Sequence, residues 1–131
     1  MADLSPFGVR AGAGTLREGE GVVLPHVWTE EGVLAAPATN GAQVLHLAVA
    51  LCVLNDVYRE ARRLAVPVEG VAVTADGAFD DLWVSKGIGY DVEIDSSADP
   101  ARIGLLLEVV DEVAEIPRAL RAGADVRRRE P

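Results

Sequence analysis

The chain has 131 residues, of which half are hydrophobic and a quarter are charged, and its formal net charge is −9. This length fits a single core, so we predict one domain spanning residues 1–131. The negative charge disfavours nucleic-acid phosphates and anionic membranes as partners, and we expect neither. No apolar leader follows Met1, and one cysteine is typical of a reducing compartment, so we expect a cytoplasmic protein.

The first part of the chain has the composition of an antiparallel hairpin. Residues 7–14 and 21–28 have the pattern of strands, and residues 17–21 between them are rich in glycine and charge. We therefore predict that these two strands pair with each other. Residues 35–38 contain a proline and are predicted to form a loop.

A long helix is predicted over residues 40–65. Thr39 or Asn40 provides its N-cap, and Pro67 ends it. Its first part, residues 44–54, contains one polar residue, and a helix that is apolar all round is buried on every side. That run is too short to span a bilayer, which favours a core helix. A small monomer has difficulty covering such a helix, so we expect a homodimer.

The second part of the chain predicts another hairpin and a second long helix. Apolar residues alternate within residues 71–75 and 88–94, which indicates two strands joined by a loop at 76–87. Asp99 caps the helix that follows, with Pro100 at its first position. Pro117 is expected to end this helix and to begin a short one. Residues 124–127 are predicted to form a closing strand.

This order of elements indicates the fold class. Strand pairs separated by helices are typical of an α+β fold with antiparallel sheets, rather than of a doubly wound parallel sheet. The predicted architecture therefore has antiparallel strands and two long central helices.

Cys52 is the only cysteine in the chain, so no internal disulfide can form. Its apolar surroundings leave two interpretations open. It is a small core side chain whose burial raises the thiol pKa, or it is a nucleophile whose thiolate a nearby cation stabilises. The candidate cation is Arg17, although Glu18 and Glu20 beside it are typical of a solvated turn.

Several segments, in order and spacing, resemble the OsmC/Ohr family of thiol-dependent hydroperoxide reductases. Thr-Asn-Gly-Ala-Gln at residues 39–43 is similar to the family's T-N-P-E-Q segment, and the spacing to Cys52 matches without a gap. Ile-Pro-Arg-Ala-Leu at 116–120 lies where the family has C-P-V-S-x-x-L. Leu-Arg-Glu-Gly at 16–19 resembles the family's first hairpin turn. The resemblance extends from about residue 10 to the C-terminus.

This resemblance implies an intertwined homodimer that reduces an organic hydroperoxide with an external thiol or dithiol and no cofactor. Cys52 matches the family's peroxide-attacking cysteine, and Arg17 matches the arginine that holds its thiolate. Ile116 stands in place of the second cysteine, and Ala42 stands in place of the family's glutamate. The family's two-cysteine cycle is therefore impossible within one chain.

Two functions remain open from the sequence. The first is single-cysteine reduction of organic hydroperoxides in stress protection. The second is a non-catalytic dimer of the same fold that binds a small apolar ligand or has a structural role. The spacing of histidine, cysteine and carboxylate residues predicts no metal site. We interpret Glu115 as part of a solvated helix face and expect Ile116 to fill a pocket beside Cys52.

Overall fold

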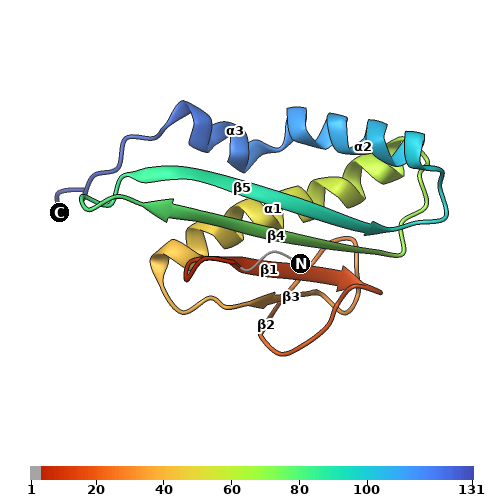
Figure 1. The fold of residues 1–131 in the computed structure, drawn as a ribbon, viewed down its shortest axis with the longest axis horizontal. Helices are drawn as coiled ribbons and strands as arrows, with labels where there is room; N and C mark the ends of the chain where they lie inside the picture. The colour runs from red at the N-terminus through yellow and green to blue at the C-terminus, as the bar shows by residue number, and fades with distance from the viewer. Residues whose placement is uncertain (1–3) are drawn as a thin grey trace.

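The computed structural model describes residues 4–131 as a five-stranded sheet with three helices on one side of it (Figure 1). In chain order the elements are β1 (Val9–Gly14), β2 (Val22–Leu24), β3 (Val33–Ala36), α1 (Gly41–Arg63), β4 (Gly70–Phe79), β5 (Ser85–Asp95), α2 (Pro100–Val113) and α3 (Glu115–Ala122). The strands lie in the order β2-β3-β1-β4-β5, and each neighbouring pair is antiparallel. The predicted α+β class with an antiparallel sheet is therefore confirmed.

The predicted hairpin between residues 7–14 and 21–28 is wrong. β1 lies in the middle of the sheet, where Ala11 faces Ala35 of β3 on one side and Val73 of β4 on the other. β2 pairs with β3 instead, at the edge of the sheet. Residues 35 and 36, predicted to lie in a loop, form the end of β3. This strand is short and mostly buried, so its sequence lacks the alternation of apolar and polar residues that marks a half-exposed strand.

The second predicted hairpin is confirmed with longer strands. β4 and β5 pair from Gly70 and Asp95 outward, and residues 80–84 connect them instead of the wider loop predicted at 76–87. The Asp80 carboxylate closes this turn by accepting hydrogen bonds from the backbone N–H groups of Leu82 and Val84. An acidic side chain that bonds its own turn therefore sets the loop length.

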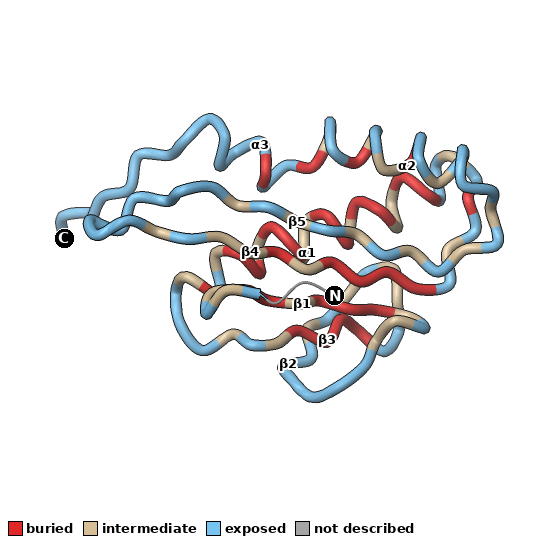
Figure 2. The backbone as a smooth tube through the Cα atoms, in the orientation of Figure 1, coloured by how far each residue is buried: buried red, intermediate tan, exposed pale blue. Residues whose placement is uncertain are grey.

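Helix α1 begins where the sequence predicted, with Asn40 as N-cap accepting a hydrogen bond from the Gln43 N–H. By length and composition α1 is also apolar enough to cross a membrane. However, it packs against β1 and β4 on one side and against α2 on the other (Figure 2), with Leu54 and Val57 fully buried. It is therefore the core helix of the fold.

Helix α2 is capped by Asp99, which accepts from the Arg102 N–H, and Pro100 is its first residue, as predicted. The break that follows occurs at Ala114, whose ψ of 120° is not helical, and not at Pro117. Pro117 is the third residue of α3, where a missing N–H breaks no intrahelical bond. The bend at Ala114 places the start of α3 beside α1 (Figure 1).

The closing strand predicted at residues 124–127 is absent. After Gly123 the described chain has no regular structure and is exposed. The sequence Ala-Asp-Val-Arg alternates like a strand, but no neighbouring edge pairs with it. Short alternation predicts a strand only where a partner edge is available.

Candidate functional site

The thiol of Cys52 lies at the junction of α1 and α3. Cys52 is half-buried, and its Sγ is 3.5 Å from Oε2 of Glu115, to which the thiol donates a hydrogen bond. The backbone N–H of Ile116 donates to the same sulfur at 3.4 Å. Both partners belong to the first turn of α3, so the bend at Ala114 is what brings them to the thiol.

A single guanidinium joins the charged groups around this thiol. Arg59 donates to Oε1 of Glu115 at 2.9 Å and to Oε2 of Glu60 at 3.1 Å. Its Nη2 also lies 3.1 Å from Oδ2 of Asp56, an ion contact whose geometry is not that of a hydrogen bond. Because Arg59 holds one oxygen of Glu115, the other is left facing Cys52.

Burial raises the pKa of the Cys52 thiol above its ordinary value. The N–H of Ile116 opposes this rise because it stabilises a thiolate, whereas the negative charges of Asp56 and Glu115 add to it. At neutral pH the resting sulfur is therefore a protonated thiol that donates to a carboxylate.

Asp56 and Glu115 have opposite electrostatic environments although they lie side by side. Asp56 is 1% exposed, and burial together with the neighbouring Glu115 raises its pKa to about 6. The contact with Asp56, its own backbone N–H and Arg59 lower the pKa of Glu115 to about 2. A proton taken up by this pair therefore resides on Asp56.

The structure does not bond Arg17 to Cys52 within one chain. Arg17 lies in the turn that follows β1, where its backbone N–H donates to the carbonyl of Gly14. Its Nε is buried and has no hydrogen-bond partner among residues 4–131. The cation that reaches the Cys52 site within the described chain is Arg59, so the role of Arg17 stays a prediction.

Glu115 and Ile116 both contact the Cys52 sulfur from the first turn of α3. The Glu115 side chain is 58% exposed, as expected of a solvated face, but one of its carboxylate oxygens also accepts from the thiol, which the sequence did not predict. The Ile116 side chain, which was expected to fill a pocket beside Cys52, is 38% exposed in the described chain, and the contact of this residue with the sulfur is made by its backbone N–H. Asp56 and Arg59 were not predicted as site residues, but a spacing in the sequence could have found them: they follow Cys52 by four and seven residues, which places all three on one helix face.

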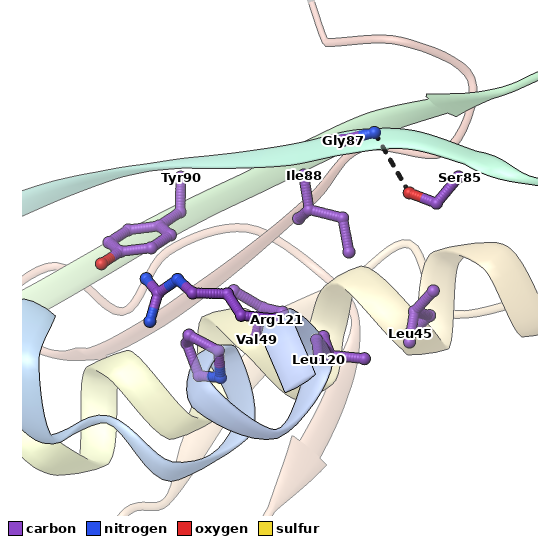
Figure 3. Close-up of a pocket in the computed structure, with 9 residues that line it drawn as sticks. Leu45, Val49, Ser85, Gly87, Ile88, Tyr90, Leu120 and Arg121 are labelled. Carbon is purple, nitrogen blue, oxygen red and sulfur yellow. Dashed lines mark hydrogen bonds between the residues drawn. The ribbon is translucent and has the colours of Figure 1, made fainter. Parts of the chain in front are cut away.

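A cavity of about 290 Å³ lies between α1, α3 and β5 (Figure 3), and Cys52 itself does not line it. Its lining is mostly apolar, with Tyr90 and Arg121 as its larger polar members; it consists of Leu45, Val49, Ser85, Gly87, Ile88, Tyr90, Pro117, Leu120 and Arg121. Val49 lies one helical turn before Cys52, and Pro117 directly follows Ile116. The cavity therefore adjoins the thiol site along the same helix pair.

No family model and no curated protein matches this sequence. Among solved structures, the chain is similar to an OsmC-like protein from Mycoplasma pneumoniae, with a TM-score of 0.59 and 13% identity over 71% of this chain and 75% of that one. It is also similar to an OsmC-like hydroperoxide resistance protein from Jannaschia sp. CCS1, with a TM-score of 0.56 and 17% identity over 95% of this chain and 92% of that one. At such low identity the agreement concerns the architecture, and it confirms the resemblance found in the sequence at that level. This chain has the fold of the OsmC/Ohr family.

Proposed function

We propose that this protein reduces organic hydroperoxides, with Cys52 as its only redox residue. The observation that carries the proposal is the set of partners around its sulfur: a carboxylate, Glu115, accepts from the thiol, and the Ile116 N–H donates to the sulfur. Similarity to a structure described as a hydroperoxide resistance protein supports the same substrate class. In this proposal Arg59 has the part that the resemblance assigned to Arg17.

The first step oxidises the sulfur. Glu115 accepts the thiol hydrogen bond and directs the proton to the carboxylate pair that it forms with Asp56. The sulfur then bonds to the terminal oxygen of the hydroperoxide, which keeps its hydrogen, as the oxygen–oxygen bond breaks. The leaving alkoxide takes the proton from the carboxylate pair and departs as an alcohol. Cys52 becomes a sulfenic acid.

The second step needs a reductant from outside the chain, because Ile116 replaces the second cysteine. An external thiol attacks the sulfenic sulfur and releases water, which leaves a mixed disulfide on Cys52. A second external thiol, or the other thiol of a dithiol, restores Cys52 and leaves as a disulfide. One hydroperoxide and two thiols thus give one alcohol, one water and one disulfide.

The same proposal assigns a substrate site, an assembly state and a compartment to the protein. The apolar cavity beside Val49 and Pro117 receives the organic part of the hydroperoxide, which favours a bulky substrate over hydrogen peroxide. The chain works as a homodimer in the reducing cytoplasm, where external thiols are abundant.

A second function is favoured by one observation, the raised pKa of Cys52. If the thiol is inert, the same cavity of about 290 Å³ belongs to a non-catalytic dimer that binds a small apolar ligand. Both functions use the cavity, but only the first uses the sulfur.

A turnover assay separates the two functions. The wild type should consume cumene hydroperoxide continuously when dithiothreitol is supplied, and Cys52→Ser should not. Glu115→Gln, which keeps the shape but removes the carboxylate, should lower turnover by about tenfold or more, in the range seen for loss of a proton-transfer group. Equal consumption by the wild type and Cys52→Ser would favour the non-catalytic function.

A further inference from the structure

The side chains of Cys52, Asp56 and Glu115, which the proposed peroxide chemistry uses for proton transfer, also converge as a set of metal-ligand types. One ligand-type atom from each, a sulfur and two carboxylate oxygens, lies within 4.8 Å of the other two. Cys52 and Asp56 are four residues apart on α1, and Glu115 opens α3. These three residues form what we call the thiol–carboxylate cluster.

From this geometry we propose that the thiol–carboxylate cluster binds a zinc-class divalent cation. The inference goes beyond the proposed peroxide chemistry and stands without it. Zinc binds sulfur at about 2.3 Å and carboxylate oxygen at about 2.0–2.2 Å, so two such ligands on a tetrahedral ion lie about 3.5 Å apart. The Sγ of Cys52 and Oε2 of Glu115 are 3.5 Å apart.

A second observation points to a ligand at this position. Asp56 is 1% exposed, and its Oδ2 is buried without a hydrogen-bond donor. The nearest cation is the Arg59 guanidinium, at 3.1 Å but not in hydrogen-bond geometry. A buried carboxylate oxygen that accepts no hydrogen bond has an uncompensated desolvation free energy, and a metal ion bound to it would compensate that free energy.

The charges around the cluster match a divalent ion. With the thiol ionised, the three ligands carry three negative charges, and Arg59, which contacts both carboxylates, supplies one positive charge. Arg59 also contacts Glu60, whose charge is balanced by Arg63. The remainder is two negative charges. Zinc binds the thiolate form, so the thiol proton is released when the ion enters.

The groups behind the ligands already hold them in place. Arg59 fixes Oε1 of Glu115 and leaves Oε2 for the ion. Asn55 donates to Oδ1 of Asp56 at 3.2 Å, and the Ile116 N–H supports the sulfur. Such outer contacts orient metal ligands in known sites. Three protein ligands leave the fourth position of a tetrahedral ion for water or another ligand.

Cobalt(II) titration tests this site directly, because a thiolate bound to cobalt gives a charge-transfer absorption in the near ultraviolet. The wild-type protein should develop this band and saturate at one cobalt ion per chain, and zinc should remove the band by competition. Cys52→Ser should show no band. Glu115→Gln and Asp56→Asn should each weaken binding by about tenfold or more, whereas Glu112→Gln on the exposed side of α2 should bind like the wild type.

Thermal unfolding with and without zinc provides a second readout, because an ion bound only by the folded protein raises Tm. A wild type with no band and no rise in Tm would overturn the proposal. It would also be overturned if both carboxylate variants bound the ion like the wild type, since the sulfur would then act alone. Peroxide turnover measured with a chelator present keeps the two proposals apart: turnover without any metal binding would remove only the metal site.

Discussion

Arg59 and Glu115 are 56 positions apart in the chain, and their side chains meet at 2.9 Å beside the Cys52 thiol. This contact orients the carboxylate so that one oxygen faces the guanidinium and the other faces the sulfur. It joins α1 to α3 and depends on the bend at Ala114. The carboxylate that contacts the Cys52 thiol is therefore held by a pair that belongs to two different helices.

Removing the guanidinium of Arg59 should slow alkylation of Cys52. Arg59→Ala leaves Asp56 and Glu115 without their shared cation, so their negative charge should raise the thiol pKa further. A rise of one unit corresponds to about 1.4 kcal/mol and to about tenfold less thiolate at neutral pH. Mass-spectrometric alkylation rates between pH 5 and 10 would measure the shift.

Arg17→Ala is the matched comparison for this variant. Arg17 makes no hydrogen bond to Cys52 within the chain, so its removal should change the alkylation curve less than Arg59→Ala does. The opposite order, with Arg17→Ala as the slower variant, would return the role of thiolate holder to Arg17 as the sequence resemblance implied.

Glu115→Gln should have the reverse effect on the thiol. The Glu115 carboxylate accepts from the thiol and raises the thiol pKa, so a neutral amide in its place should favour the thiolate. Alkylation near pH 7 should become several times faster, while peroxide turnover should fall because the proton acceptor is gone. The exposed Glu112→Gln should leave both rates unchanged. Slower alkylation of Glu115→Gln would contradict the assigned direction.

The pKa of Asp56 predicts a pH dependence of stability. The folded protein keeps the Asp56 proton up to about pH 6, whereas the unfolded chain releases it near pH 4, so the folded state binds more protons between these values. The free energy of unfolding should therefore fall as pH rises through this window, by roughly 1–3 kcal/mol from this residue.

Asp56→Asn removes the Asp56 proton from this linkage, and Asp56→Asn combined with Glu115→Gln removes the titration of both members of the pair. Urea unfolding of all three proteins at pH 4, 5, 6 and 7 should show the wild type losing stability relative to Asp56→Asn as pH rises. A difference that stays constant across the four pH values would show that Asp56 has an ordinary pKa.

The alternating and capped segments were predictable because local chemistry determines them. Asn40 and Asp99 cap their helices with their own side chains, and the long β4–β5 hairpin shows apolar alternation. Strand β3 was missed because a buried strand that pairs on both sides does not alternate, and its partners are decided by the whole sheet.

The site was predictable only in part. Cys52 stood out as the one sulfur nucleophile, and Asp56 and Arg59 share its helix face by spacing alone. Glu115 could not be found in this way. It reaches Cys52 through a bend at Ala114, and no side-chain cap or proline at that position marks the bend in the sequence.

The core helix gives a prediction about stability. Leu54 is fully buried in α1, so Leu54→Ala should cost about 2–5 kcal/mol in the free energy of unfolding through lost burial and a cavity. Val44 on the same helix is 49% exposed, and Val44→Ala should stay within about 0.5 kcal/mol of the wild type. Similar costs at the two positions in urea unfolding would contradict the placement of α1.

Assembly is predicted to be a homodimer. Large apolar side chains remain exposed in one chain; they include Val22, Val23, Val27, Leu82, Trp83, Val84, Leu105 and Leu120. Stable interfaces of obligate dimers bury about 2,000 Å² or more, and such side chains are typical of them. Light scattering at micromolar concentration should give twice the chain mass. A folded species at the single-chain mass would contradict this prediction.

A single-turnover experiment tests the central claim most directly, that the Cys52 sulfur itself reduces an organic hydroperoxide. Metal-free protein with no thiol reductant is mixed with excess cumene hydroperoxide, and the alcohol formed is counted per chain. If the Cys52 sulfur is the reductant, one alcohol per chain should form in a burst, Cys52 should carry one added oxygen by mass spectrometry, and Cys52→Ser should give no burst. Folded wild-type protein that forms no alcohol and leaves Cys52 unmodified would contradict it.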